Sequence, residues 1–212
     1  APAPAPPDEA ASKMPVPEKT ADDAVLSLDV LYVADMLGRF FTPDCPGGKP
    51  RSYLLPLART VQALEKESVQ AGRTPLVLGG GNLFSPDAIG HYLLSNLSGA
   101  IFVAGEFRGM NMAASAWGPQ DLLAPENVIE MVARIFFRQE MPLVATNAVC
   151  AKNVQCSSRL VPSVLLEAGG IRIGVMALFP EKFTASLPRG TSEWLSFTDP
   201  AAAYKAQRER LL

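Results

Sequence analysis

Two spacings of apolar residues run through this chain and predict that strands and helices alternate along it. Between residues 53 and 71 the apolar side chains recur every three or four positions, as on one face of a helix, and Gly72 is suited to end it. Shorter apolar runs lie between such segments and predict buried strands. The predicted helices are 53–71, 86–97, 125–140 and 200–212, and the predicted strands are 25–33, 75–78, 100–104 and 142–146.

A hairpin is predicted in the last quarter of the chain. Two β-rich runs, 160–167 and 171–178, flank Gly169 and Gly170, which tolerate the positive φ of a tight turn. The final helix has Thr198 or Asp199 as its N-terminal cap, and no strand follows it. Strands that alternate with helices predict a layered α/β sandwich, and we expect that sandwich to be incomplete at its C-terminus.

Residues 1–24 differ in composition from the rest of the chain. They are rich in Pro and Ala and poor in groups that could be buried, so they predict a stiff, solvated linker before a domain at 25–212. Linkers of this kind often join an exported domain to a membrane anchor or a cleaved signal. We therefore expect an extracytoplasmic protein, periplasmic or at the cell surface, with membrane or lipid anchoring through this linker. A trimmed disordered tail is the alternative.

Charge and cysteine content narrow the function classes. The formal net charge is −2, and no basic run with interleaved aromatic residues occurs, which argues against a nucleic-acid partner. Cys150 and Cys156 enclose a short loop, and in an oxidising compartment this spacing suits a disulfide that leaves Cys45 unpaired. Three reduced thiols are the alternative. Because the chain has one histidine, His91, a Ser-His-Asp or Cys-His site is not credible.

An ordered set of short segments resembles a known family. Residues 33–39 (VADMLGR) resemble an Asp-x-His-Gly motif, 76–84 (LVLGGGNLF) an Asp-x-Gly-Asp motif, and 113–122 (AASAWGPQDL) a Gly-Asn-His-(Asp/Glu) motif. These motifs belong to the N-terminal, metal-binding domain of the 5′-nucleotidase branch of the calcineurin-like metallophosphoesterases. Residues 141–147, 164–178 and 198–203 are similar to the strand, hairpin and helix start that follow in that domain. The resemblance covers 25–212 and implies an α/β/β/α metallophosphoesterase-like sandwich.

The resemblance also implies a site for two metal ions, most of whose ligands are replaced in this chain. Asp35 keeps its identity as a metal ligand, whereas Leu37 stands in place of a His and has no lone pair to donate. Asn82 stands where an Asp would bridge the two ions, and its neutral amide is a poor bridge. Pro119 replaces an Asn ligand of the second ion.

Two further positions bear on the reaction that the resemblance implies. Gln120 replaces the His that assists phosphoryl transfer, and Asp121 matches a variable acidic position. One carboxylate ligand does not assemble a dinuclear site, so we expect the two-metal mechanism to be lost and no cofactor to be bound. If the chain is active, the resemblance implies a divalent ion, Mn, Zn or Fe, held by Asp35 and Asn82.

Two functions from different classes follow from this pattern. The first is an exported, non-catalytic metallophosphoesterase-like domain that acts as a binding or structural subunit of a cell-envelope complex, completed by a protein partner or by a further C-terminal segment. The second is a metal-dependent, 5′-nucleotidase-like phosphohydrolase with an altered, mononuclear site. That site would use Asp35, Asn82, Gln120 and Asp121.

Overall fold

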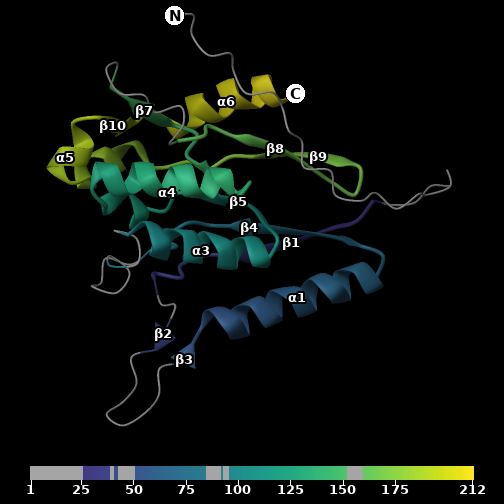
Figure 1. The fold of residues 1–212 in the computed structure, drawn as a ribbon. Helices are drawn as coiled ribbons and strands as arrows, with labels where there is room; N and C mark the ends of the chain where they lie inside the picture. Colours follow the sequence, from purple (N-terminus) through teal and green to yellow (C-terminus); the bar gives the residue numbers. More distant parts are fainter. Residues whose placement is uncertain (1–25, 39–40, 43–50, 85–91, 93–95, 152–159) are drawn as a thin grey trace, which may run out of the picture.

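A computed structural model describes residues 26–38, 41–42, 51–84, 92, 96–151 and 160–212 of the chain (Figure 1). Its centre is a parallel sheet with the strand order β1-β4-β5-β6. Strand β4 is apolar on both faces, as expected of a strand covered from two sides, whereas β1 lies at one end of the sheet. The strands are β1 (Leu28–Val33), β4 (Thr74–Gly79), β5 (Met112–Ala116) and β6 (Leu143–Val144).

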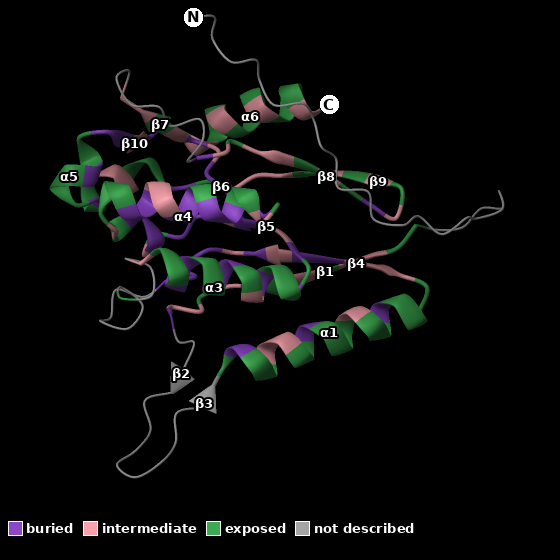
Figure 2. Cartoon of the chain, viewed as in Figure 1, coloured by how far each residue is buried: buried purple, intermediate pink, exposed green. Residues whose placement is uncertain are grey.

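Three helices pack against this sheet. Helix α1 contacts β1 and β4, α3 contacts β5, and α4 contacts α3 and β6. Helix α4 is the most deeply buried of the three, and the ring of Phe136 on this helix packs edge-on against Phe84, with 5.8 Å between the ring centroids. Figure 2 shows the buried positions gathered along α4 and the central strands. The helices are α1 (Leu54–Gln70), α3 (Leu97–Gly109) and α4 (Glu126–Arg138).

A hairpin and a last helix form the next layers. In Figure 1 the hairpin of β8 (Val164–Ala168) and β9 (Ile171–Val175) lies between the parallel sheet and α6 (Pro200–Leu211). Strand β8 contacts β4, and a Cβ on Gly174 of β9 would lie 2.8 Å from a methyl carbon of Leu211 of α6. The order of layers is therefore helix, sheet, hairpin, helix.

Short elements complete the described part of the chain. Strand β10 (Leu195–Phe197) pairs antiparallel with β7 (Ala148–Cys150), and β2 (Phe41–Thr42) pairs with β3 (Arg51–Ser52). The remaining helical turns are η1 (Asp121–Leu123), η2 (Glu181–Ser186) and α5 (Arg189–Ser192). Among the residues described, no helix has the length and apolar character needed to cross a membrane.

Most of the predicted elements are confirmed, and one is wrong. The two glycines of the hairpin turn, Gly169 and Gly170, have φ of 57° and 78°, and Asp199 caps α6 by accepting hydrogen bonds from two backbone N–H groups. The strand predicted at 100–104 is part of helix α3. Asn96 caps this helix, and its buried residues (Ala100, Val103, Ala104 and Phe107) follow the helical period rather than alternation.

Other predictions fall wholly or mainly outside the described residues. The linker at 1–24 does so completely, and the helix at 86–97 overlaps the described chain only at Tyr92 and at the start of α3.

Strand β5 was not among the predicted elements, because its residues, MAASA, are small and carry little β-branched or aromatic signal.

Candidate functional site

Three loops meet at the carboxyl ends of β1, β4 and β5. We name them the first loop (34–38), the second loop (80–84) and the third loop (117–121). The first and second loops run side by side and are joined by three backbone hydrogen bonds, and a fourth joins the second loop to the end of β1. In these, Gly80 N–H donates to Val33 O (2.8 Å), Asp35 N–H to Gly81 O (3.1 Å), Leu37 N–H to Asn82 O (2.8 Å) and Gly38 N–H to Leu83 O (3.0 Å).

Left-handed backbone conformations recur in the first two loops. Asp35 has φ of 55°, Leu37 of 48° and Asn82 of 51°, and Gly81 has φ of 83°. Asp and Asn enter this region readily, whereas Leu does so at a cost of about 1 kcal/mol or more. The side chain of Leu37 is half-buried and offers no polar atom to the site.

The second and third loops touch through their main chains. A Cβ atom placed on Gly118 would lie 1.9 Å from the backbone nitrogen of Asn82, and one placed on Gly81 would lie 2.6 Å from the backbone nitrogen of Gly118. Neither backbone has room for a side chain on its neighbour. Glycine at these positions therefore lets the second and third loops lie in direct contact.

The side chain of Asn82 links all three loops. Its Nδ2 donates a hydrogen bond of 2.7 Å to Oδ1 of Asp35 in the first loop. Its Oδ1 accepts a hydrogen bond of 3.0 Å from the backbone N–H of Gln120 in the third loop. The structure thus brings together Asp35, Asn82 and Gln120, three of the residues predicted from the sequence.

Asp121, the fourth predicted residue, ends the third loop, and its side chain is buried rather than exposed at the surface of the site. It is 2% exposed, its Oδ1 accepts a hydrogen bond of 2.9 Å from Phe84 N–H, and its Oδ2 accepts one of 2.7 Å from Gly118 N–H. The carboxylate therefore fastens the second loop to the third. The Gly-x-x-Asp spacing is the sequence signal for this turn, because Asp121 N–H also donates to Gly118 O.

Burial raises the pKa of the Asp121 carboxyl. Loss of solvent raises the pKa of its carboxyl from 3.8 to about 7, although hydrogen bonds from backbone N–H groups of the second and third loops act in the opposite direction. A carboxyl with a raised pKa in the folded state contributes stability that is fully present below its unfolded pKa and is lost as the pH rises through 7.

We therefore expect the protein to lose stability relative to its D121N variant as the pH increases from 4 to 8, by up to about 1 kcal/mol per pH unit in the steepest part. Urea unfolding of both proteins at each pH measures this difference. The comparison cancels the groups that both proteins share, and a difference that does not depend on pH would show that Asp121 keeps one protonation state over this range.

The donor atoms of this site do not fit a pair of metal ions. Of the matched ligand positions, Asp35 supplies a carboxylate, Leu37 an apolar chain and the exposed Pro119 no side-chain donor. The amide oxygen of Asn82 already accepts the N–H of Gln120. Within the described part of the chain, no group of three or more His, Cys, Asp or Glu side chains is arranged to hold a metal ion.

Of the two cysteines predicted to form a disulfide, one lies among the described residues. Cys150 ends β7 and is half-buried, whereas Cys156 lies outside the described residues, as does Cys45. The Cys150–Cys156 disulfide therefore stays a prediction.

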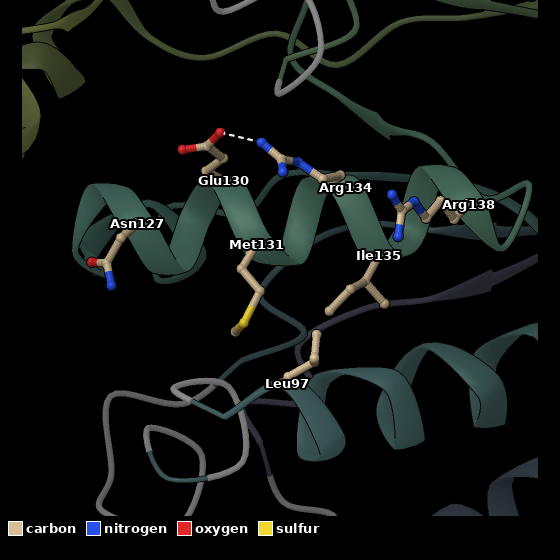
Figure 3. Close-up of a pocket in the computed structure, with 7 residues that line it drawn as sticks. All are labelled: Leu97, Asn127, Glu130, Met131, Arg134, Ile135 and Arg138. Carbon is tan, nitrogen blue, oxygen red and sulfur yellow. Dashed lines mark hydrogen bonds and ion pairs between the residues drawn. The ribbon is translucent and has the colours of Figure 1, made fainter.

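A cavity of about 390 Å³ lies between α4 and the start of α3 (Figure 3). Met131 and Ile135 of α4 point toward Leu97 of α3, while Glu130 and Arg134 form an ion pair on another side of α4. None of the predicted site residues lines it. The cavity and the three-loop site are therefore separate features.

The chain was compared with known proteins by sequence and by structure. No protein-family model matches the chain, and no curated protein matches it in sequence. Its structure is similar to that of a 5′-nucleotidase precursor from Thermus thermophilus, with a TM-score of 0.61 and 16% identity over 86% of this chain. It is also similar to a putative 5′-nucleotidase from Staphylococcus aureus, with a TM-score of 0.65 and 11% identity over 87% of this chain. The chain has the metallophosphoesterase fold.

A third solved structure is also similar to this chain. The sulfate thiohydrolase SoxB from Thermus thermophilus matches with a TM-score of 0.57 and 17% identity over 90% of this chain. The chain spans 34% of the length of each of the two 5′-nucleotidase structures and 43% of SoxB. The α/β sandwich and the resemblance identified from the sequence are confirmed at the level of the fold.

Proposed function

We propose that this chain is a non-catalytic metallophosphoesterase-like domain that works by binding, as a subunit of an extracytoplasmic cell-envelope complex. One observation carries the proposal. At the place where the resemblance implies a bridging carboxylate, the chain has a carboxamide whose two polar atoms are both engaged within the protein. The three loops keep a compact arrangement, but their side chains do not offer the ligand set of a dinuclear hydrolase.

The second candidate, a phosphohydrolase with a single ion of Mn, Zn or Fe, is less well supported. It would use Asp35, Asn82, Gln120 and Asp121. Both carboxylate oxygens of Asp121 accept backbone hydrogen bonds, and the residue is 2% exposed, so its carboxylate does not face a surface at which a phosphate ester could bind. The remaining charged group is the exposed carboxylate of Asp35, and a single carboxylate makes a weak cation site.

The proposed location rests on the N-terminal segment and the cysteines of the chain. A Pro- and Ala-rich segment at 1–24 precedes the domain, and Cys150 and Cys156 have a spacing that suits a disulfide in an oxidising compartment. One of the similar structures, from Thermus thermophilus, is that of a 5′-nucleotidase precursor. We propose a protein partner for this domain, because a subunit of a complex is held there by contacts with another chain.

Metal content and hydrolysis together test the proposed function. After incubation with manganese, zinc and iron and removal of the excess, we expect less than about 0.1 ion per chain by plasma mass spectrometry, because the site lacks ligands. Hydrolysis of p-nitrophenyl phosphate with the metals present should equal that of a D35A variant. The E209A variant, which removes an exposed carboxylate of α6, is the matched control. One tightly held ion, with hydrolysis that D35A abolishes and E209A preserves, would overturn the proposal.

A further inference from the structure

The carboxamide of Asn82 contacts each of the other two loops through a different atom. Its Nδ2 is 2.7 Å from Oδ1 of Asp35, and its Oδ1 is 3.0 Å from the backbone nitrogen of Gln120. A carboxylate at this position could accept the hydrogen bond from Gln120, but it has no hydrogen to donate to Asp35. Two carboxylates at such a distance repel each other unless a cation or a proton lies between them.

We propose that the Asn82 carboxamide replaces bound cations as the link between the first, second and third loops, so that residue 82 decides whether this arrangement depends on metal. The inference rests on the proposed non-catalytic function and adds the element that makes a metal-free site stable. The backbone at Asn82 has φ of 51°, which Asn and Asp both adopt readily, so exchange between these two residues changes the chemistry of the link without changing the backbone.

The N82D variant isolates this chemistry. The substitution keeps the size of the side chain and the acceptor for Gln120 N–H, but it replaces the donor to Asp35 by a second negatively charged oxygen. The two carboxylates then form a pair of oxygen ligands of the kind that Mn²⁺ binds. In EDTA we expect the thermal midpoint of N82D to lie about 3–6 °C below that of the unmodified protein. Millimolar MnCl2 at constant ionic strength should recover at least about half of this loss, because the cation binds the folded state alone.

A double exchange provides the matched control. In D35N/N82D the donor and the acceptor are swapped between the two loops, so an amide again faces a carboxylate. We expect its midpoint in EDTA to return to within about 1 °C of that of the unmodified protein, and MnCl2 to shift neither of these two proteins by more than about 1 °C. Circular dichroism should be the same for all three proteins.

Two results would overturn the inference. One is an N82D protein in EDTA that is as stable as the unmodified protein, since the hydrogen bond to Asp35 would then link nothing. The other is an unmodified protein that MnCl2 stabilises as much as it stabilises N82D. The first result would leave the proposed non-catalytic function standing, because the metal content and the hydrolysis assay do not depend on it. Bound metal with D35A-sensitive hydrolysis would instead reject the proposed function itself.

Discussion

Replacing Gly118 by Ala should lower the free energy of unfolding by about 3 kcal/mol or more. This is one of the two largest effects that we expect of a single substitution in this protein. The added Cβ would lie 1.9 Å from the backbone nitrogen and 2.3 Å from Oδ1 of Asn82. The backbone of Asn82 cannot retreat, because its carbonyl oxygen accepts a hydrogen bond of 2.8 Å from Leu37 N–H. Thermal unfolding should show a fall in the midpoint of about 6–12 °C.

Gly105 offers a control of the same chemistry. It lies within α3 and is exposed, and a Cβ on it would have no heavy atom within 4 Å. G105A should therefore raise stability by about 0.5–1 kcal/mol, because Ala loses less backbone entropy than Gly in a helix. If G118A and G105A change the midpoint alike, the close contact between the second and third loops does not exist in solution.

Replacing Asn147 by Ala should cost a similar amount, about 3 kcal/mol, through unpaired polar groups rather than through overlap. The side chain is 1% exposed, and its Nδ2 donates to Phe179 O at 2.8 Å and to Thr198 O at 2.7 Å. Its Oδ1 accepts from Phe179 N–H at 2.8 Å. One side chain thus joins the segment after β6 to the segments after β9 and before α6, and urea unfolding should show the full loss.

The exposed Asn127 of α4 provides the comparison for this second prediction. N127A should stay within about 0.5 kcal/mol of the unmodified protein, since nothing is buried at that position. The near-ultraviolet spectrum of N147A gives an independent signal, because Phe179 packs against Phe197 with 4.5 Å between ring centroids. A variant with unchanged stability would mean that the hydrogen bonds of Asn147 are exchanged for water at no cost.

The alternation of apolar spacings was enough to predict a layered α/β fold, because the helix at 53–71 and the hairpin around Gly169 have strong local patterns. Local pattern failed where burial overrides it. The run 100–104 is apolar enough for a strand, but the capping residue Asn96 and the buried Phe107 place it in helix α3. The short side chains of β5 gave no strand signal, although that strand pairs with β4 and β6.

The residues of the candidate site were predictable as a group, whereas their roles were not. The resemblance grouped Asp35, Asn82, Gln120 and Asp121 as positions of one site, and the structure brings three of them into one network of hydrogen bonds. The burial of Asp121 and the contact at Gly118 depend on how the third loop packs on the second. That packing brings together residues more than thirty positions apart, which no local pattern reports.

The three backbone hydrogen bonds between the first and second loops have a consequence for how the outer surface of this site can change. Main-chain groups are present whatever side chains the loops carry. These hydrogen bonds therefore do not depend on which side chains occupy the exposed positions, Pro119 among them. In an enzyme, each ligand on such a surface is constrained by the ion that it holds. Under the proposed binding role, the same surface is free to change with the partner that it contacts, as the variable loops of a binding protein do, while the strands beneath keep their places.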